Sequence, residues 1–307
     1  MLRTQHNKSL AATIELSLAS PLLQELGRDA RALLGVVAFF PQGVGENNLG
    51  WLFPTTPDGI ETLDGFCILS LTYRSNGFIT MLAPLRDYLS PKDPKTSPLL
   101  YSTKEQCFTR LLVNIDPNKP NFVETRWITS EDVNVGHLLN VFTTIDANSD
   151  GVWGACANFI VHLYWHKSRV TILKPRIEGL PDDHHSKPGC LYQLARLFGS
   201  VGDRVEERRL LIHTLKLWRE WGYDPWVAST LVQLSDVSRQ MGLHKEGIPQ
   251  AKEALEIRAR LGDKRRQAEC LAMLSPLLND DKQLDAAEEA ASRAIDLLPE
   301  KGEEFRV

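Results

Sequence analysis

Two histidine pairs carry side chains that can bind a metal ion. His162 and His166 lie four residues apart, a spacing that places two imidazoles on the same side of a helix. No glutamate lies between them, as the H-E-x-x-H pattern requires, and no third ligand is near in the sequence. His184 and His185 follow two aspartates in a proline-containing stretch, which is typical of a solvated linker. We therefore predict no metal site at either pair.

Residues 146–151 are a second candidate, because their sequence D-A-N-S-D-G matches the first half of a calcium-binding loop. The twelfth position of such a loop is a glutamate that supplies two oxygens, and here it is Ala157. The eighth position, which is normally aliphatic, is Trp153. Asn, Ser, Asp and Gly are also the residues of a turn that leads into a helix N-cap. The turn is therefore the favoured interpretation.

The glycine-rich stretch 43–50 lacks the lysine that contacts phosphate in the G-x-x-x-x-G-K-[ST] pattern, and Glu46 places a negative charge there. No such pattern occurs elsewhere, and neither a G-x-S-x-G elbow nor a C-x-x-C pair is present. The stretch is best explained as a surface loop between helices. The sequence therefore predicts no catalysis and no bound cofactor.

Composition narrows the class of protein further. The 307 residues carry a net charge of −4, which gives no general attraction to nucleic acid or to an anionic membrane. No apolar run is long enough to span a membrane. The five cysteines are odd in number and far apart, which is typical of reduced thiols. We expect a cytoplasmic protein that binds neither nucleic acid nor membrane.

The elements that hold these residues are most evident in a forty-residue repeat near the end of the chain. Leu194, Leu234 and Leu274 are spaced by 234 − 194 = 40 and 274 − 234 = 40 residues. Small or short side chains follow at the same spacing twenty positions later, at Thr214, Ala254 and Ala294. Each unit has the pattern of two amphipathic helices, and such repeats indicate a solenoid whose helix pairs bury their apolar sides against neighbours.

Stretches that contain several prolines and glycines divide the chain into three expected domains. Residues 1–95 contain three helices and a hairpin, which is the order of a winged-helix domain. The individual elements are expected as a helix from Pro21 to Pro41, shorter helices near 48–53 and 58–66, and strands at 67–73 and 78–82. Asn76 and Gly77 connect the two strands, and Asn-Gly is a strong signal for a tight hairpin turn.

Residues 96–187 are expected to form a helical linker domain. Its helices lie near 130–146 and 150–167, between loop-rich joints at 90–121 and 175–188. Residues 188–307 then form three repeats, at 188–227, 228–267 and 268–307. The expected fold class is mainly α, with a winged-helix domain followed by a helical joint and an α-solenoid like that of tetratricopeptide (TPR) repeats.

Several segments resemble a known family. Ile14–Leu18, Leu26–Leu34, Phe39–Gly43 and Leu69–Leu71 resemble the winged-helix segment of STAND ATPases of the NB-ARC/NACHT type, which in large fungal sets end in TPR repeats. The resemblance extends from the winged helix through the helical joint to the repeats. It implies a portion of such a protein that lacks the P-loop domain.

One motif of that family is incomplete in this chain. The family ends its winged helix with Met-His-Asp, and the histidine senses bound ADP. Met81 matches this motif, but Leu82 and Ala83 occupy the places of the histidine and the aspartate. Neither side chain can donate to a phosphate or titrate near neutral pH. The departure puts nucleotide switching in doubt.

The resemblance implies a non-catalytic protein–protein interaction module, similar to the C-terminal half of a STAND sensor in signalling or innate immunity. The alternative is the regulatory portion of an ATPase switch whose nucleotide-binding domain is missing or separately encoded. DNA binding is disfavoured, because residues 58–64, where the third helix of a winged helix would enter DNA, carry three acidic residues and no basic one.

In stacks of the TPR type the first helices of the pairs line a concave groove. Six side chains are expected to face this groove, namely Tyr192, Arg196, Asp236, Arg239, Glu269 and Asn279. An aromatic ring among mixed charges suits an extended peptide or a protein tail. An ordinary solvated helix face explains the same charges equally well.

Two features set the third repeat apart. Pro276 falls inside its first helix, where it removes a hydrogen bond, whereas Pro249 lies earlier in a helix and is easier to accommodate. No polar capping helix follows Pro299, and an uncapped solenoid exposes an apolar face. This end is expected to promote self-association.

Overall fold

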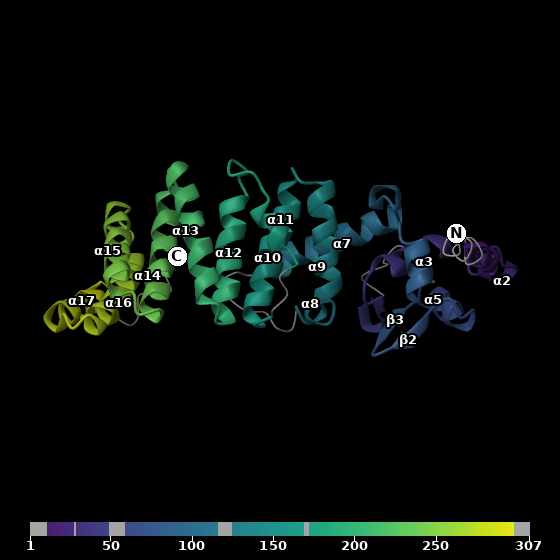
Figure 1. The fold of residues 1–307 in the computed structure, drawn as a ribbon, viewed down its shortest axis with the longest axis horizontal. Coiled ribbons are helices and arrows are strands. Elements are labelled where there is room, and N and C mark those ends of the chain that lie inside the picture. Colours follow the sequence, from purple (N-terminus) through teal and green to yellow (C-terminus); the bar gives the residue numbers. More distant parts are fainter. Residues whose placement is uncertain (1–10, 28, 49–58, 116–124, 169–171, 298–307) are drawn as a thin grey trace, which may run out of the picture. The chain divides into compact units, whose positions relative to one another are not determined.

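The computed structural model describes residues 11–27, 29–48, 59–115, 125–168 and 172–297 (Figure 1). The chain forms two compact units, residues 1–162 with 170–173 and residues 163–169 with 174–307. The boundary at His162 and Leu163 falls inside a single helix, so we describe the packing of each unit separately.

The first unit begins with short helices and a small sheet. Residues 11–18 are helical, and the helices that follow are α2 (Pro21–Glu25), α3 (Ala30–Phe39), α5 (Gly59–Ile68) and α6 (Ala83–Leu89). Strands β1 (Val44–Gly45), β2 (Tyr73–Ser75) and β3 (Phe78–Thr80) form an antiparallel sheet in the order β1-β3-β2. Val44 and Arg74 both pair with Ile79. This arrangement confirms the expected winged-helix-like fold.

The hairpin turn is confirmed, but the strand before it is shorter than expected. Asn76 and Gly77 adopt φ values of 51° and 80°, the left-handed conformation that a two-residue hairpin turn requires. The expected strand at 67–73 is wrong over most of its length, because α5 continues to Ile68, a turn with Ser70 at a φ of 57° follows, and β2 begins only at Tyr73. Leu63 and Phe66 are fully buried on this helix, so helical packing prevails over the β-branched and apolar local composition.

The expected continuous helix from Pro21 to Pro41 is also wrong. It is interrupted at Gly27, whose φ of 102° cannot continue a right-handed helix, and the chain resumes as α3. Residues 46–48 form the 3₁₀ turn η1 (Glu46–Asn48), and the rest of the helix expected at 48–53 lies outside the described residues.

The stretch expected to be a loop-rich joint contains a long helix, α7 (Pro98–Asn114). Pro98 lies in its first turn, where a missing backbone N–H costs little. The Ser97 side chain caps the helix by accepting a hydrogen bond from the Leu100 N–H at 3.3 Å. Pro94 likewise begins the 3₁₀ turn η2 (Pro94–Thr96). These prolines therefore mark helix starts within the expected joint.

Three further helices follow, namely α8 (Arg126–Ser130), α9 (Asp132–Ile145) and α10 (Asp150–Trp165). The last two confirm the helix pair expected from the sequence. Phe142, Trp153 and Phe159 are among the largest fully buried side chains of the first unit. The core therefore continues from the winged-helix-like part into this helix pair.

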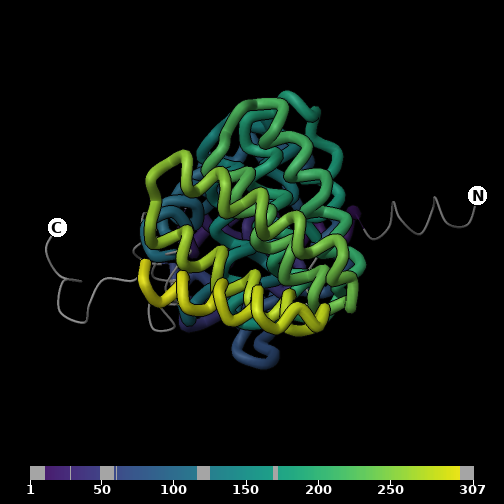
Figure 2. The backbone as a smooth tube through the Cα atoms, turned by 90° about the vertical axis from the view of Figure 1, so that its left-hand side faces the viewer, coloured from purple at the N-terminus to yellow at the C-terminus, as the bar shows by residue number. Residues whose placement is uncertain are grey.

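The second unit is a regular stack of antiparallel helices (Figure 2). After the short α11 (Lys174–Glu178) come α12 (Lys187–Ser200), α13 (Arg204–Glu220), α14 (Asp224–Gln240), α15 (His244–Arg260), α16 (Lys264–Asp280) and α17 (Leu284–Asp296). Each consecutive pair from α12 to α17 packs together, and α17, yellow in Figure 2, is the last described helix. This is the expected TPR-like architecture.

The helices of this stack repeat every twenty residues. Gly202, Gly222, Gly242 and Gly262 follow successive helices and adopt φ values of 87°, 68°, 73° and 69°. Glycine is favoured there because it has no Cβ to clash in the left-handed conformation. The aligned leucines Leu194, Leu234 and Leu274 are all buried in the stack.

Both internal prolines lie within continuous helices. Pro276 is inside α16 and Pro249 is inside α15, and neither helix ends there. The carbonyls that lose their intrahelical donor belong to Ala272 and Lys245, four residues earlier, and both residues are exposed. Water can therefore hydrogen-bond to the carbonyls that each proline leaves without a partner.

Candidate binding surface

Two aromatic rings from neighbouring first helices meet in the second unit. Tyr192 on α12 and Trp226 on α14 contact edge to face, with ring centroids 6.1 Å apart. Trp226 also stacks on Trp218 of α13, with ring centroids 5.7 Å apart and an interplanar angle of 17°. Trp226 nevertheless stays 46% exposed. A large apolar face held firmly on both sides and open to solvent can anchor a partner side chain.

These rings belong to a larger aromatic cluster. Trp221 and Tyr223 lie edge to face against Trp218 at 5.8 and 5.6 Å, and Tyr223 is also exposed. The buried Trp218 indole N–H makes no hydrogen bond to any of the residues that the structure describes. Aromatic side chains thus run from α12 to the turn between α13 and α14.

Arg196 lies one turn after Tyr192 on α12. Its guanidinium stacks on the Tyr164 ring, 4.4 Å from the centroid, and donates to the Gln193 side chain at 3.2 Å. Within the described parts of the chain no carboxylate forms an ion pair with Arg196. A stacked guanidinium keeps a fixed orientation, and its remaining N–H groups suit the two oxygens of a carboxylate.

Two more arginines lie near the Tyr192 hydroxyl. Burial raises the pKa of Tyr192, and the positive charges of Arg196, Arg266 and Arg258 oppose that rise. The nearly buried Arg258 donates to the Pro225 carbonyl at 2.8 Å. We refer to Tyr192, Arg196, Trp226, Arg258 and Arg266 as the Tyr192 surface.

The arginines of the Tyr192 surface differ in how far they are neutralised. Arg258 also donates to the Ser229 hydroxyl at 2.6 Å and has Asp263 at 3.8 Å. Arg266 pairs with Glu269 at 2.7 Å, and both of these side chains remain about half exposed. Arg196 is therefore the cation with the least local neutralisation.

The six groove residues expected from the sequence separate into groups. Tyr192 and Arg196 lie together, as described. Asp236 and Arg239 pair with each other at 3.1 Å on α14. The Glu269 carboxylate is held by Arg266 and Arg265, and Asn279 is exposed near the end of α16. That all six contact one ligand stays a prediction.

Trp226, Arg258 and Arg266 were not among the residues expected from the sequence. Trp226 and Arg266 occupy equivalent places, because 266 − 226 = 40. The forty-residue repeat therefore places both residues at the same position near the beginning of a first helix. Arg258 lies on a second helix, and only the fold shows that its side chain reaches across to α14.

The calcium-like loop is a turn, as favoured from the sequence. The Asp146 carboxylate lies 3.6 Å from the Lys104 ammonium and 3.8 Å from that of Lys95. The Trp153 indole donates to the Ala147 carbonyl at 2.6 Å, which ties the turn to α10. Across the described residues there is no group of three or more His, Cys, Asp or Glu side chains placed to hold a metal ion.

The stretch with His184 and His185 is solvated, as expected, because Pro181, Asp182, Asp183 and His185 are exposed, but it also makes specific contacts. The two imidazoles stack at 4.7 Å. The buried Lys187 ammonium donates to Asp182 at 2.7 Å, and His213 on α13 contacts the same Asp182 oxygen at 3.2 Å. The contact with His213 connects this exposed segment to the first repeat, and no pattern in the sequence indicated that partner.

The glycine-rich stretch was expected to be a surface loop, but Val44 and Gly45 form the buried strand β1 and Gly43 is buried as well, so that expectation was wrong. The buried Glu131 carboxylate accepts hydrogen bonds from the Gly45 N–H at 2.9 Å and the Asn48 side chain at 2.8 Å. Asn134 donates to the Gly43 carbonyl at 2.8 Å. The Glu131 carboxylate next to this stretch repels phosphate, so we interpret the stretch as a structural connection.

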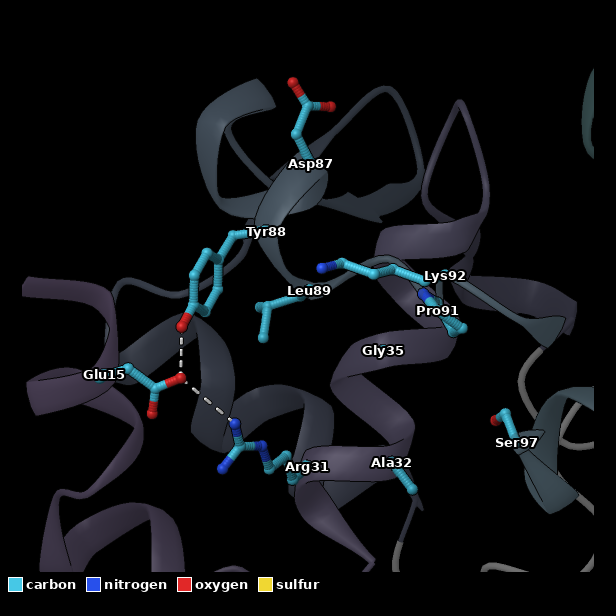
Figure 3. A pocket seen from close by; sticks show the side chains of 10 residues that line it. All are labelled: Glu15, Arg31, Ala32, Gly35, Asp87, Tyr88, Leu89, Pro91, Lys92 and Ser97. Carbon is cyan, nitrogen blue, oxygen red and sulfur yellow. Dashed lines mark hydrogen bonds and ion pairs between the residues drawn. The ribbon is translucent and has the colours of Figure 1, made fainter. Parts of the chain in front are cut away.

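A cavity of about 560 Å³ lies in the first unit (Figure 3). Its lining residues are Glu15, Arg31, Ala32, Gly35, Asp87, Tyr88, Leu89, Pro91, Lys92 and Ser97. Tyr88 and Arg31 both reach the same Glu15 oxygen, Arg31 at 3.5 Å. Two acidic and two basic side chains line the cavity, so its charges are balanced and it favours no ligand of one sign.

The position of the STAND sensor motif has no polar side chain. Met81 is buried, whereas Leu82 is exposed and precedes α6.

In the hairpin of the winged-helix-like part, Arg74 forms ion pairs with Asp64 and with Glu46, so its charge is neutralised locally. In the described part of the chain no helix has both the length and the apolar character needed to cross a bilayer.

No protein-family model matches the chain, and no curated protein matches it. The solved structures include distant likenesses to TPR-like repeat proteins. A Podosopora anserina protein described as a kinesin light chain with nearly identical TPR-like repeats has a TM-score of 0.48 and 14% identity, covering 67% of this chain and 97% of that chain.

Two further likenesses are more distant. BtubC (BKLC) from P. vanneervenii has a TM-score of 0.41 and 16% identity and covers 91% of each chain. A STAND protein with a tetratricopeptide repeat sensor from Pyrococcus horikoshii has a TM-score of 0.42 and 12% identity. That match covers 90% of this chain and 51% of the STAND protein.

Proposed function

We propose that this protein is a non-catalytic interaction module that binds an extended peptide or protein tail along the first helices of its TPR-like stack. The observation that carries the proposal is the half-exposed Trp226 ring, held between Tyr192 and Trp218 beside the stacked guanidinium of Arg196. Rigid aromatic rings and arginines are the side chains that most often dominate protein interfaces. By the resemblance noted in the sequence, the module corresponds to the C-terminal half of a STAND-type sensor.

A peptide library displayed on phage and selected against the full chain tests this proposal. Peptides that bind the wild-type chain are expected to lose binding to a Tyr192→Ala, Trp226→Ala double variant. Lys216→Ala is the matched control, since Lys216 is exposed on the second helix α13 and its ion pair is with Glu220 of the same helix. Equal binding to wild type and double variant would remove the support for this surface.

The winged-helix-like fold of the first unit favours a second candidate, the regulatory portion of an ATPase switch. That candidate requires the chain to respond to a nucleotide-binding partner or domain. Retention of ADP by the purified chain would support it and would contradict a purely passive module. The exposed Leu82 at the sensor position argues against it, because an aliphatic side chain cannot hydrogen-bond to phosphate.

A further inference from the structure

The geometry points to an acidic peptide segment as the occupant of the Tyr192 surface, with a carboxylate on Arg196 and an apolar side chain against Trp226. This inference rests on the proposed function and adds the chemistry of the partner. It follows from how the charges and rings of this surface are already engaged within the chain.

Charge is the first step. Arg196, Arg258 and Arg266 surround the Tyr192 hydroxyl, and the carboxylates beside them belong to Asp263 and Glu269. The aspartate lies at 3.8 Å from the buried Arg258, and the glutamate is occupied by Arg266. Among the described residues, the stacking and hydrogen-bond partners of the Arg196 side chain are neutral, namely the Tyr164 ring and the Gln193 amide oxygen. The region thus carries an excess positive charge, although the chain as a whole is acidic.

Orientation is the second step. The Tyr164 ring covers one face of the Arg196 guanidinium, and the Gln193 oxygen takes one of its N–H groups. Stacking leaves the edge of the guanidinium available, and a carboxylate can accept two parallel N–H groups there. Because the guanidinium is already fixed, less side-chain entropy is lost when it binds.

The apolar contact is the third step. Trp226 is backed by Trp218, and Tyr192 touches its edge, so the ring cannot collapse onto the helices and remains exposed. A leucine or aromatic side chain of the partner can cover it while flanking acidic residues reach the arginines. Elsewhere on the first helices, the Asp236 and Arg239 charges satisfy each other. The acidic preference is therefore confined to the Tyr192 surface.

A nucleic acid is disfavoured as the occupant. Its continuous phosphates would meet the carboxylates of Asp263 and Glu269 next to the arginines, and the net charge of −4 repels a polyanion. A short acidic segment places few charges and spaces them by single residues, so it can avoid these carboxylates.

The test uses the full chain and three fluorescein-labelled probes: a glutamate-rich peptide with one central leucine, the same peptide with glutamine for every glutamate, and a single-stranded oligonucleotide. The acidic peptide should bind about tenfold or more tightly than the glutamine peptide, since hydrogen bonds between charged groups are the stronger ones. Its affinity should fall as salt is added, because exposed charges are screened.

Matched variants separate the Tyr192 surface from general charge effects. Arg196→Gln should weaken the acidic peptide about tenfold. Arg265→Gln removes the same charge from a neighbouring, 85% exposed arginine that is not part of the Tyr192 surface, and it should leave binding unchanged. Circular dichroism melting curves of both variants confirm that each is folded, and Arg196→Lys provides a second variant that keeps the charge without the planar fork.

The outcomes are distinguishable. Acidic preference that is lost in Arg196→Gln and kept in Arg265→Gln supports the inference. Binding of both peptides with equal affinity, or tighter binding of the oligonucleotide, overturns the acidic partner. If the phage library yields peptides without acidic residues that still need Trp226, the proposed function stands and this inference fails. If no displayed peptide depends on Trp226, the proposed function fails with it.

Discussion

At the scale of single residues, the five turns that connect α12 to α17 each contain a residue with positive φ, and this residue is glycine in all but the last turn. Four glycines adopt positive φ after successive helices, and Lys282 occupies the equivalent place after α16 with a φ of 62°. A side chain in the left-handed conformation costs about 1–2 kcal/mol relative to glycine. The last described turn therefore carries local strain that the earlier turns avoid.

Substitutions at these turns give effects of opposite sign. Gly222→Ala should lower the free energy of unfolding by about 1 kcal/mol, and Lys282→Gly should raise it by about 0.5–1 kcal/mol. Gly189→Ala is the matched control, because Gly189 lies inside α12 with open space at its Cβ position, and alanine there should be neutral or stabilising. Urea unfolding followed by circular dichroism measures all three. A destabilised Lys282→Gly variant would contradict the argument.

Glu131 shows how a buried carboxylate can be structural. It is 2% exposed, and burial raises its pKa although hydrogen bonds from Asn48, Asn134 and Gly45 oppose the rise. A carboxyl group with a raised pKa contributes most to stability at acidic pH, and that contribution decreases as the pH rises through the folded-state pKa. The benefit of this residue is therefore smaller at neutral pH than at acidic pH.

Glu131→Ala should release the glycine-rich stretch, since it removes the acceptor of the Gly45 N–H and leaves the Asn48 amide with the longer hydrogen bond to the Ser130 hydroxyl at 3.3 Å. Hydrogen–deuterium exchange of the segment with Gly45 should become faster in this variant, equivalent to a loss of about 2–4 kcal/mol of local protection. The exposed Glu61→Ala is the control and should leave exchange in this loop unchanged. The difference from wild type should narrow from acidic to neutral pH, and a widening difference would show that the sign is wrong.

At the scale of elements, the prolines show how much of the fold could be predicted from the sequence. The helix pairs of the stack could be predicted, because leucines and small residues repeat every forty positions and the period is independent of context. The helix α7 could not, because five prolines between 90 and 121 resemble a loop. Pro98 is in fact a first-turn residue beside the Ser97 cap, and only the burial of Leu100 and Leu111 reveals the helix.

The candidate site was predictable to a similar degree. Tyr192 and Arg196 lie on a first helix whose pattern identifies its groove side. Trp226 and Arg266 lie at helix beginnings, where sequence alone does not show which way the side chains face. The partners Tyr164 and Arg258 come from other helices, and their contacts depend on packing that no local pattern encodes.

Proline position can be tested directly on two first helices. Pro276→Ala should raise the free energy of unfolding by about 1–2 kcal/mol, because it restores a hydrogen bond to Ala272 and part of the cost of about 3 kcal/mol. Pro225→Ala is the contrasting change, since Pro225 lies in the first turn of α14 and should be neutral or destabilising when lost. Thermal melting of both variants decides between these signs.

Glu206 connects α11 to the first repeat, and its cationic neighbours lower its pKa. Arg209 and then Lys174 hold the pKa of Glu206 down to about 2, against an effect of burial in the other direction. Lys174 on α11 contacts Glu206 on α13 at 2.6 Å. A carboxylate with a lowered pKa stabilises the fold above its ordinary value of 4.5 and loses that effect as the pH falls through about 2.

Glu206→Gln should therefore lower the melting temperature at neutral pH, and the difference from wild type should shrink on acidification toward pH 2. Glu220→Gln is the control, because Glu220 is exposed and its contact with Lys216 is 3.7 Å long. Melting curves at several pH values and at low and high salt measure both variants. A constant difference at every pH would mean that the charge of Glu206 does not hold α11 in place.

At the scale of the whole molecule, the last described helix has one side without the packing that its equivalents have. Leu215 on α13 is 9% exposed and Leu255 on α15 is partly buried, whereas their forty-residue equivalent Ile295 on α17 is 69% exposed. Leu284 lies eleven residues earlier, about three helical turns, so both side chains share one face of α17. An adjacent face buries Ala287, Ala290 and Ala294, which belong to the core that α17 shares with α16.

We predict that this face of α17 associates with a second copy of the chain, because association would remove Leu284 and Ile295 from water, as Leu215 is removed from water within the stack. Static light scattering after gel filtration should show a mass that rises with protein concentration. Leu284→Glu, Ile295→Glu should abolish the rise, whereas Val205→Glu, at another exposed apolar residue, should not. A constant monomer mass across concentrations would contradict the prediction, and a mass that still rises in the double variant would place the contact on another surface.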